Sequence, residues 1–182
     1  MRVSVRKVAF SGVIAALYVV MTVAVHPLSY GPLQVRFSEV LCILPFFFPF
    51  SVWGLFIGCI VANLFSPYHL LDIIVGPIAS LLAALCTMYI GKMKNREKVT
   101  TKALACFPPV IFNAVLIGAM IAYIVVGEGA SEAFLTLFIS YGLWVGLGQL
   151  IVLYLIGLPL MVYLPTTKLI DKLNNLYSGG EV

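Results

Sequence analysis

The sequence is poor in charged residues, and this scarcity limits the class of protein. Asp, Glu, Lys and Arg make up 10% of its 182 residues, whereas 62% are hydrophobic and the mean hydropathy is +1.10. A water-soluble domain of this size does not need so much apolar surface, so the composition indicates an integral membrane protein. The apolar runs are continuous and do not alternate with polar residues, which favours membrane-spanning helices over a β-barrel.

The sequence also lacks the motifs of several enzyme and binding classes. The cysteines Cys42, Cys59, Cys86 and Cys106 stand singly, so neither a disulfide framework nor a zinc site is predicted. No nucleotide-binding loop, GxSxG or HExxH motif occurs, and we expect this chain alone to hydrolyse no ATP and to hold no metal or other cofactor. The basic residues lie at the ends of apolar segments instead of forming a basic face, which argues against nucleic-acid binding.

Five apolar stretches follow one another, at Val8–Val25, Val40–Phe65, Leu71–Gly91, Ala103–Val126 and Ala133–Leu164. The second is interrupted by prolines, and it is either one long span or two short spans that turn near Phe50 and Ser51. The fifth is longer than one span needs at 1.5 Å per residue, so we expect part of it to lie along the membrane surface. The tail from Thr166 is amphipathic and polar.

The distribution of basic residues favours two spans in the second stretch. Because cytoplasmic loops are enriched in Lys and Arg, the N-terminus and the basic loop Lys92–Lys102 should lie on the same side. Two short spans, of about 14–17 residues each, satisfy this condition, and all Lys and Arg except Arg36 are then cytoplasmic. We therefore predict one all-α domain, residues 1–182, with six transmembrane helices, both termini cytoplasmic, in the cell membrane.

Three ionisable residues stand alone in the first half of this lipid-compatible chain. Between Lys7 and Lys92 the only Asp, Glu, Lys or Arg residues are Arg36, Glu39 and Asp72. An ionised group within the membrane costs roughly 2.5–3.5 kcal/mol at the bilayer centre and usually marks a functional site. The predicted topology places all three toward the outside, so we expect a site for a small polar molecule there.

Each of these charged residues also has a simpler interpretation. Arg36 and Glu39 are three residues apart and would share a helical face, where they would either bind a ligand or form an interfacial ion pair. Asp72 begins an apolar segment, so it either pairs with a cationic group of the ligand or stabilises a helix N-terminus.

Four further residues are candidates for contact with a ligand. Asn63 and Gln149 are amides within apolar runs, and a buried amide needs a partner, which is either the ligand or a neighbouring helix. Tyr141 and Trp144 precede Gln149 by about two turns and one turn of helix. They would either stack on an aromatic part of the ligand or form an interfacial aromatic belt.

Three stretches carry a resemblance to a known family, namely Gln34–Phe46, Gly54–Ser66 and Leu71–Gly76. They resemble the substrate-binding (S) components of energy-coupling factor (ECF) transporters, and within them the queuosine-precursor transporter (QueT) family. The resemblance implies a six-helix protein that binds a trace nutrient from outside and docks on a transmembrane coupling protein with two ATPase subunits, which use the ATP. For this family the cargo would be a 7-deazaguanine base, such as the aminomethyl form preQ1.

The resemblance also implies a docking role for small residues in the first apolar stretch. Ala9, Gly12 and Ala16 have a spacing that lets another helix approach closely. In S components a comparable stripe contacts the coupling protein, whereas the simpler interpretation is packing within this chain.

Three other functions remain compatible with the sequence. The first is an S component for a different vitamin or purine, such as riboflavin or thiamine. The second is a solitary small-solute permease, although the chain lacks the internal duplication of many carriers. The third is an intramembrane enzyme, for which no convincing nucleophile–base pair is present.

Overall fold

The computed structural model describes residues 5–31 and 34–178, and the regular elements within these ranges are helices. The first half contains α1 (Val5–Ala24), α2 (His26–Ser29), the 3₁₀ helix η1 (Phe37–Ile43), α3 (Leu44–Phe47), α4 (Ser51–Asn63) and α5 (His69–Ile90). The second half contains α6 (Val99–Ala105), α7 (Phe107–Phe112), the π-helical turn η2 (Asn113–Ile117), α8 (Gly118–Gly127), α9 (Phe134–Val152), the π-helical turn η3 (Leu153–Gly157), α10 (Leu158–Tyr163), the 3₁₀ turn η4 (Leu164–Thr166) and α11 (Leu169–Ser178).

Four of the helical runs are long and apolar enough to cross a membrane. They are Val5–Ala24, Leu70–Ile90, Val99–Gly127 and Phe134–Thr166, and two shorter apolar helices, Phe37–Phe47 and Ser51–Asn63, lie between the first and second. The structure thus confirms an all-helical protein with the character of an integral membrane protein. The count of six spans and the side on which each terminus lies stay predictions.

The ambiguous second stretch consists of two helical segments, as the charge distribution favoured. The chain turns at residues 48–50, where Pro49 cannot donate a backbone hydrogen bond, and α4 begins at Ser51. Both segments are shorter than expected. The first has only four α-helical residues after its 3₁₀ turns, and α4 has 13 residues.

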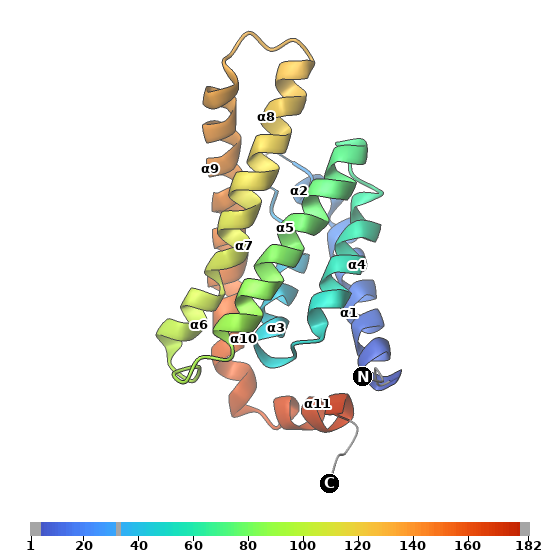
Figure 1. Ribbon diagram of the computed structural model, residues 1–182, viewed down its shortest axis with the longest axis vertical. Helices are drawn as coiled ribbons and strands as arrows, with labels where there is room; N and C mark the ends of the chain where they lie inside the picture. Colours follow the sequence, from blue (N-terminus) through green and yellow to red (C-terminus); the bar gives the residue numbers. More distant parts are fainter. Residues whose placement is uncertain (1–4, 32–33, 179–182) are drawn as a thin grey trace.

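In the fifth stretch, where we expected part of the chain to lie along the membrane surface, the helical run is continuous. Residues Phe134–Thr166 form one helical rod, which takes up its extra length with the π-helical turn η3 and extends past the ends of α1, α4 and α5 (Figure 1). The amphipathic tail forms α11 instead, which lies across the end of the bundle (Figure 1). Its Ile170 and Leu173 pack against the apolar cluster around Phe48 and Met161.

Helices α1 and α4 approach each other closely because small residues face each other. A Cβ atom on Gly54 would lie 2.6 Å from the backbone oxygen of Ser11, and one on Gly58 would lie 3.0 Å from the Cα atom of Ala15. This contact brings the buried side chain of Tyr18 against α4. The small residues of α1 therefore include two that serve packing within the chain.

The two ends of the bundle differ in charge. In the described ranges, the Lys and Arg residues other than Arg36 lie at the end formed by the start of α1, the α5–α6 connection and α11 (Figure 1). We call this the basic end. The opposite end, formed by α2, the α4–α5 connection and the α8–α9 connection, carries Glu128 and Glu132 and is called the acidic end.

The close α1–α4 contact gives the first prediction. Gly54→Ala should destabilise the protein by about 1–3 kcal/mol, because the added methyl group meets backbone atoms that cannot move independently. Thermal unfolding of the detergent-purified protein measures the effect. Gly127→Ala is the matched control, since a Cβ there has nothing within 4 Å. Equal melting temperatures for the two variants would contradict the packing described.

Candidate functional site

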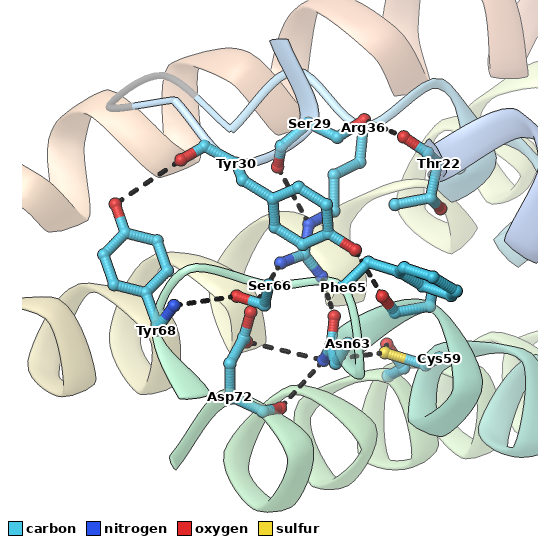
Figure 2. Close-up of polar contacts among 12 residues, drawn as sticks. Thr22, Ser29, Tyr30, Arg36, Cys59, Asn63, Phe65, Ser66, Tyr68 and Asp72 are labelled. Atoms are coloured by element: carbon cyan, nitrogen blue, oxygen red, sulfur yellow. Dashed lines mark hydrogen bonds and ion pairs between the residues drawn. The ribbon is translucent and has the colours of Figure 1, made fainter. Parts of the chain in front are cut away.

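A buried polar cluster lies toward the acidic end, where three chain segments converge. The connection before η1 supplies Arg36, the last residue of α4 is Asn63, and the first turn of α5 supplies Asp72 (Figure 2). All three side chains are 3% exposed or less. The start of η1 and the end of α4 thus lie beside the cluster, and the last carbonyls of α4 accept hydrogen bonds from Leu64, Phe65, Ser66 and Tyr30.

Arg36 forms an ion pair with Asp72 and not with Glu39. Its Nη2 atom donates to Asp72 Oδ2 at 3.1 Å, its Nη1 to Asn63 Oδ1 at 3.2 Å and its Nε to the Ser29 carbonyl at 3.1 Å. The predicted pairing of Arg36 with Glu39 on one helical face fails because Arg36 precedes the helix and has an extended backbone. Asp72, in turn, is already engaged by a cation of this chain.

Asn63 connects α4 to α5 through the same cluster. Its Nδ2 atom donates to the Asp72 carbonyl at 2.8 Å and lies 3.4 Å from Asp72 Oδ1. This approach requires a glycine one turn along α5, because a Cβ on Gly76 would overlap the Asn63 amide. Gly76 was not predicted as a site residue, although it ends one of the stretches that carry the resemblance.

Two tyrosines cover the ion pair on the side of the acidic end. The ring of Tyr30 lies over Arg36, whose Cζ is 4.9 Å from the ring centroid, and its hydroxyl donates to the Ala62 carbonyl at 2.5 Å. Burial raises the pKa of the Tyr30 phenol to about 12, so it remains a donor at neutral pH. The Tyr68 hydroxyl lies 3.5 Å from the Tyr30 carbonyl, which joins the two loops (Figure 2).

Glu39 is the buried carboxylate of η1. It is 1% exposed and accepts hydrogen bonds from the Tyr18 hydroxyl at 2.6 Å and the Cys42 thiol at 3.1 Å. Among the residues that the structure describes, none pairs with Glu39 as a cation. With Arg36 and Asp72 balancing each other, ionised Glu39 leaves this region one negative charge in excess.

The remaining candidates divide between the interior and the outer surface of α9. Gln149 is buried within α9, a helix that contacts η1, and its Oε1 atom has no described hydrogen-bond partner. Tyr141 is half-buried and packs against the apolar cluster that contains Ile117 and Ile121.

Trp144 is not brought to the polar cluster. It is 50% exposed and lines an outer groove of about 350 Å³ with Ser140, Leu143 and Leu147. The prediction that it stacks on a ligand together with Gln149 overlooked their angular separation. Five residues on an α-helix correspond to a rotation of about 140°, which places Trp144 on a different face.

The small residues of the predicted docking stripe lie on the outside of α1. Ala9, Gly12 and Ala16 are exposed, and a Cβ atom on Gly12 would meet nothing within 4 Å. The neighbouring Ser11 and Ala15 face α4. Packing within the chain, the simpler interpretation of the stripe, therefore applies to Ser11 and Ala15 and not to the three predicted residues.

No group of three or more His, Cys, Asp or Glu side chains is placed to hold a metal ion in the ranges that the structure describes. The cluster around Arg36 and Glu39 presents hydrogen-bond donors and acceptors and charges of both signs. Its donors, acceptors and surplus carboxylate suit recognition of a polar organic molecule.

Comparison with known proteins assigns the chain to a family. The sequence profile described as QueT transporter matches residues 8–166. The chain belongs to the QueT transporter family. A relative in Lactococcus lactis subsp. cremoris, named queuosine precursor transporter QueT, is 38% identical over 72 residues, which cover 38% of this chain and 42% of the relative. No solved structure matches.

Membership of the QueT transporter family agrees with the apolar helices. A transporter family together with several helices long enough to cross a bilayer identifies a multi-pass membrane protein. The family is one of transporters and not of enzymes. The matched segment covers less than half of the length of this relative.

The buried ion pair gives the second prediction. Asp72→Asn should destabilise the protein by about 3–5 kcal/mol, because it leaves the Arg36 guanidinium buried without a counter-charge. The double variant Arg36→Gln with Asp72→Asn should recover most of this loss, as neutral groups remain. Thermal unfolding of Asp72→Asn, of Arg36→Gln and of the double variant measures the coupling. Losses that simply add would show that the two side chains are energetically independent.

Proposed function

We propose that this QueT family protein is the substrate-capture subunit of an ATP-driven, ECF-type importer, and that its cargo is a queuosine precursor. The cargo would be a 7-deazaguanine base such as preQ1. The observation that carries the proposal is the buried carboxylate of Glu39, which has no described counter-cation and lies beside a balanced ion pair. The name of the Lactococcus relative supports the choice of cargo.

The chemistry of the cargo complements this carboxylate. A 7-deazaguanine presents N–H groups along one edge, and Glu39 accepts them as charge-assisted hydrogen bonds. The aminomethyl form also carries a positive charge, which offsets the excess negative charge of the site. Asn63, Arg36 and Asp72 hold the connection and the two helices in position, and the Oε1 atom of Gln149 is a further acceptor on the facing helix.

The proposed orientation has six spans with the acidic end outside. It is supported by the separation of charge between the two ends and by the positive-inside rule. In this orientation the loops that contain Tyr30 and Tyr68 face the outer compartment. Cargo then enters from outside, past these two loops.

Energy comes from partner subunits in the proposed mechanism. The stripe of Ala9, Gly12 and Ala16 docks on the transmembrane coupling protein, and two ATPase subunits bound to that protein hydrolyse ATP. The exposure of the stripe and the free space at Gly12 support this docking face, because close helix contacts in membranes use small residues. The chain itself contributes binding and docking surfaces.

The role of Glu39 gives the third prediction. Glu39→Gln should weaken preQ1 binding by about 10–100-fold, since a charge-assisted hydrogen bond is replaced by a neutral one. Folding should be retained, because the side chain keeps its shape and Tyr18 can still donate to it. Isothermal titration of the purified protein measures the affinity.

The control for this experiment is a carboxylate at the same end of the molecule. Glu128→Gln removes a charge from an exposed residue and should leave the affinity within about twofold. Unchanged affinity in Glu39→Gln would remove Glu39 from the site. Mass spectrometry of the small molecule that co-purifies with the unaltered chain tests the cargo, and riboflavin, thiamine or another purine there would replace preQ1.

The docking stripe gives the fourth prediction. Gly12→Leu should leave preQ1 binding unchanged and reduce co-purification with the coupling protein at least severalfold, because a bulky side chain prevents close helix contact. Gly127→Leu, which also has free space around it but lies at the acidic end, is the matched control. Normal assembly of Gly12→Leu would reject this face. Uptake without the ATPase module would instead establish a solitary permease.

A further inference from the structure

Gln34 has an unusual backbone conformation. It lies in the connection between α2 and η1, two residues before Arg36, and its φ angle is +43°, the only positive φ of a non-glycine residue in the described ranges. Hydrogen bonds hold it on both sides, from Gln34 N–H to the Gly31 carbonyl at 3.0 Å and from Arg36 N–H to the Gln34 carbonyl at 2.9 Å. Glycine, asparagine or aspartate is the ordinary choice in this conformation.

The side chain of Gln34 is unusual as well. It is 1% exposed, and its Nε2 atom has no hydrogen-bond partner among the described residues. A buried N–H group without a partner destabilises a folded protein, and most such groups are satisfied. Gln34 thus combines a strained backbone with an unsatisfied donor, and such a combination is typical of a ligand-binding residue.

The position of Gln34 sets it apart from the other buried polar side chains that lack a partner. Ser51 begins α4 near the basic end, Asn113 lies in the π-helical turn η2, and the unpartnered atom of Gln149 in α9 is the acceptor Oε1 and not a donor. Gln34 is joined directly to the segment that contains Arg36 and Glu39. Arg36 already directs three of its N–H groups to Ser29, Asn63 and Asp72, so it serves mainly to hold the protein together.

We infer that Gln34 determines cargo specificity by donating from Nε2 to the ring carbonyl oxygen of the cargo. This inference rests on the proposed function. A 7-deazaguanine carries a carbonyl acceptor next to an N–H donor, and Gln34 and Glu39 supply the complementary donor and acceptor. A site with a buried donor strongly rejects ligands that leave this donor unpaired. Gln34, and not Arg36, then donates the hydrogen bond to the ring carbonyl oxygen of the cargo.

Two substitutions separate this role from a structural one. Gln34→Gly removes the side chain and suits the positive φ, so the ligand-free protein should melt at the same temperature or higher. Gln34→Met keeps the length of the side chain and removes the amide. Both variants should bind preQ1 at least about tenfold more weakly. Ser51→Ala, which also removes an unpartnered buried group, is the control and should bind normally.

The decisive measurement compares two cargo molecules by isothermal titration. One is preQ1, and the other is its 6-thio analogue, which keeps the N–H groups but has a poor acceptor in place of the carbonyl oxygen. The unaltered protein should prefer preQ1 by about tenfold, and this preference should fall to about one in Gln34→Gly and Gln34→Met.

The outcomes distinguish this inference from the proposed function. Failure of the unaltered protein to bind preQ1 would overturn the proposed cargo and the inference with it. Binding by the unaltered protein with an undiminished preference for preQ1 in both variants would overturn the role of Gln34 alone. A lower melting temperature of Gln34→Gly, with normal affinity, would assign Gln34 a purely structural role.

Discussion

The ion pair between Arg36 and Asp72 is the interaction on which the acidic half of the bundle depends. Removing two charges from water costs several kcal/mol for each ion. The attraction between the ions offsets this cost only when their other donors and acceptors are also hydrogen-bonded. Here the guanidinium also donates to Ser29 and Asn63 and lies under the ring of Tyr30. The pair therefore fixes the entry to η1, the end of α4 and the start of α5 relative to one another.

The shortness of η1 and α4 follows from this arrangement. A helix that ends within the membrane region leaves backbone groups unpaired, and lipid cannot satisfy them. Irregular backbone is tolerated at such a depth only when it is buried in protein or lines a polar cavity. The short helix η1 therefore begins, and α4 ends, next to the polar cluster, where protein groups surround it. The long helices α1, α5 and α9 instead carry exposed apolar side chains such as Val20, Ile74 and Leu143.

Much of the fold could be predicted from the sequence, because the length of each apolar run and the positions of the basic residues between the runs are read directly from the order of residues. The rare charged residues could also be singled out as candidates, since ionised groups are costly in lipid. The ion pair of Arg36 with Asp72 could not be predicted. Residues three apart share a face only when both are helical, and Arg36 has an extended backbone. Tyr18 and Gly76 were missed for a similar reason, since their contacts with Glu39 and Asn63 depend on how helices face each other.

The charge balance of the cluster connects its structure to the proposed role. Arg36 and Asp72 neutralise each other, whereas Glu39 is satisfied only by the hydroxyl of Tyr18 and the thiol of Cys42. Two neutral donors stabilise a buried carboxylate less than a cation does, so the ligand-free site is left electrostatically incomplete. In the proposed function a cationic cargo with N–H donors supplies the missing counter-charge, and its binding stabilises the protein in proportion to the logarithm of cargo concentration over the dissociation constant. In the proposed function the charge of Glu39 thus favours tight binding of a cation, because Glu39 gains a cationic partner only in the bound state.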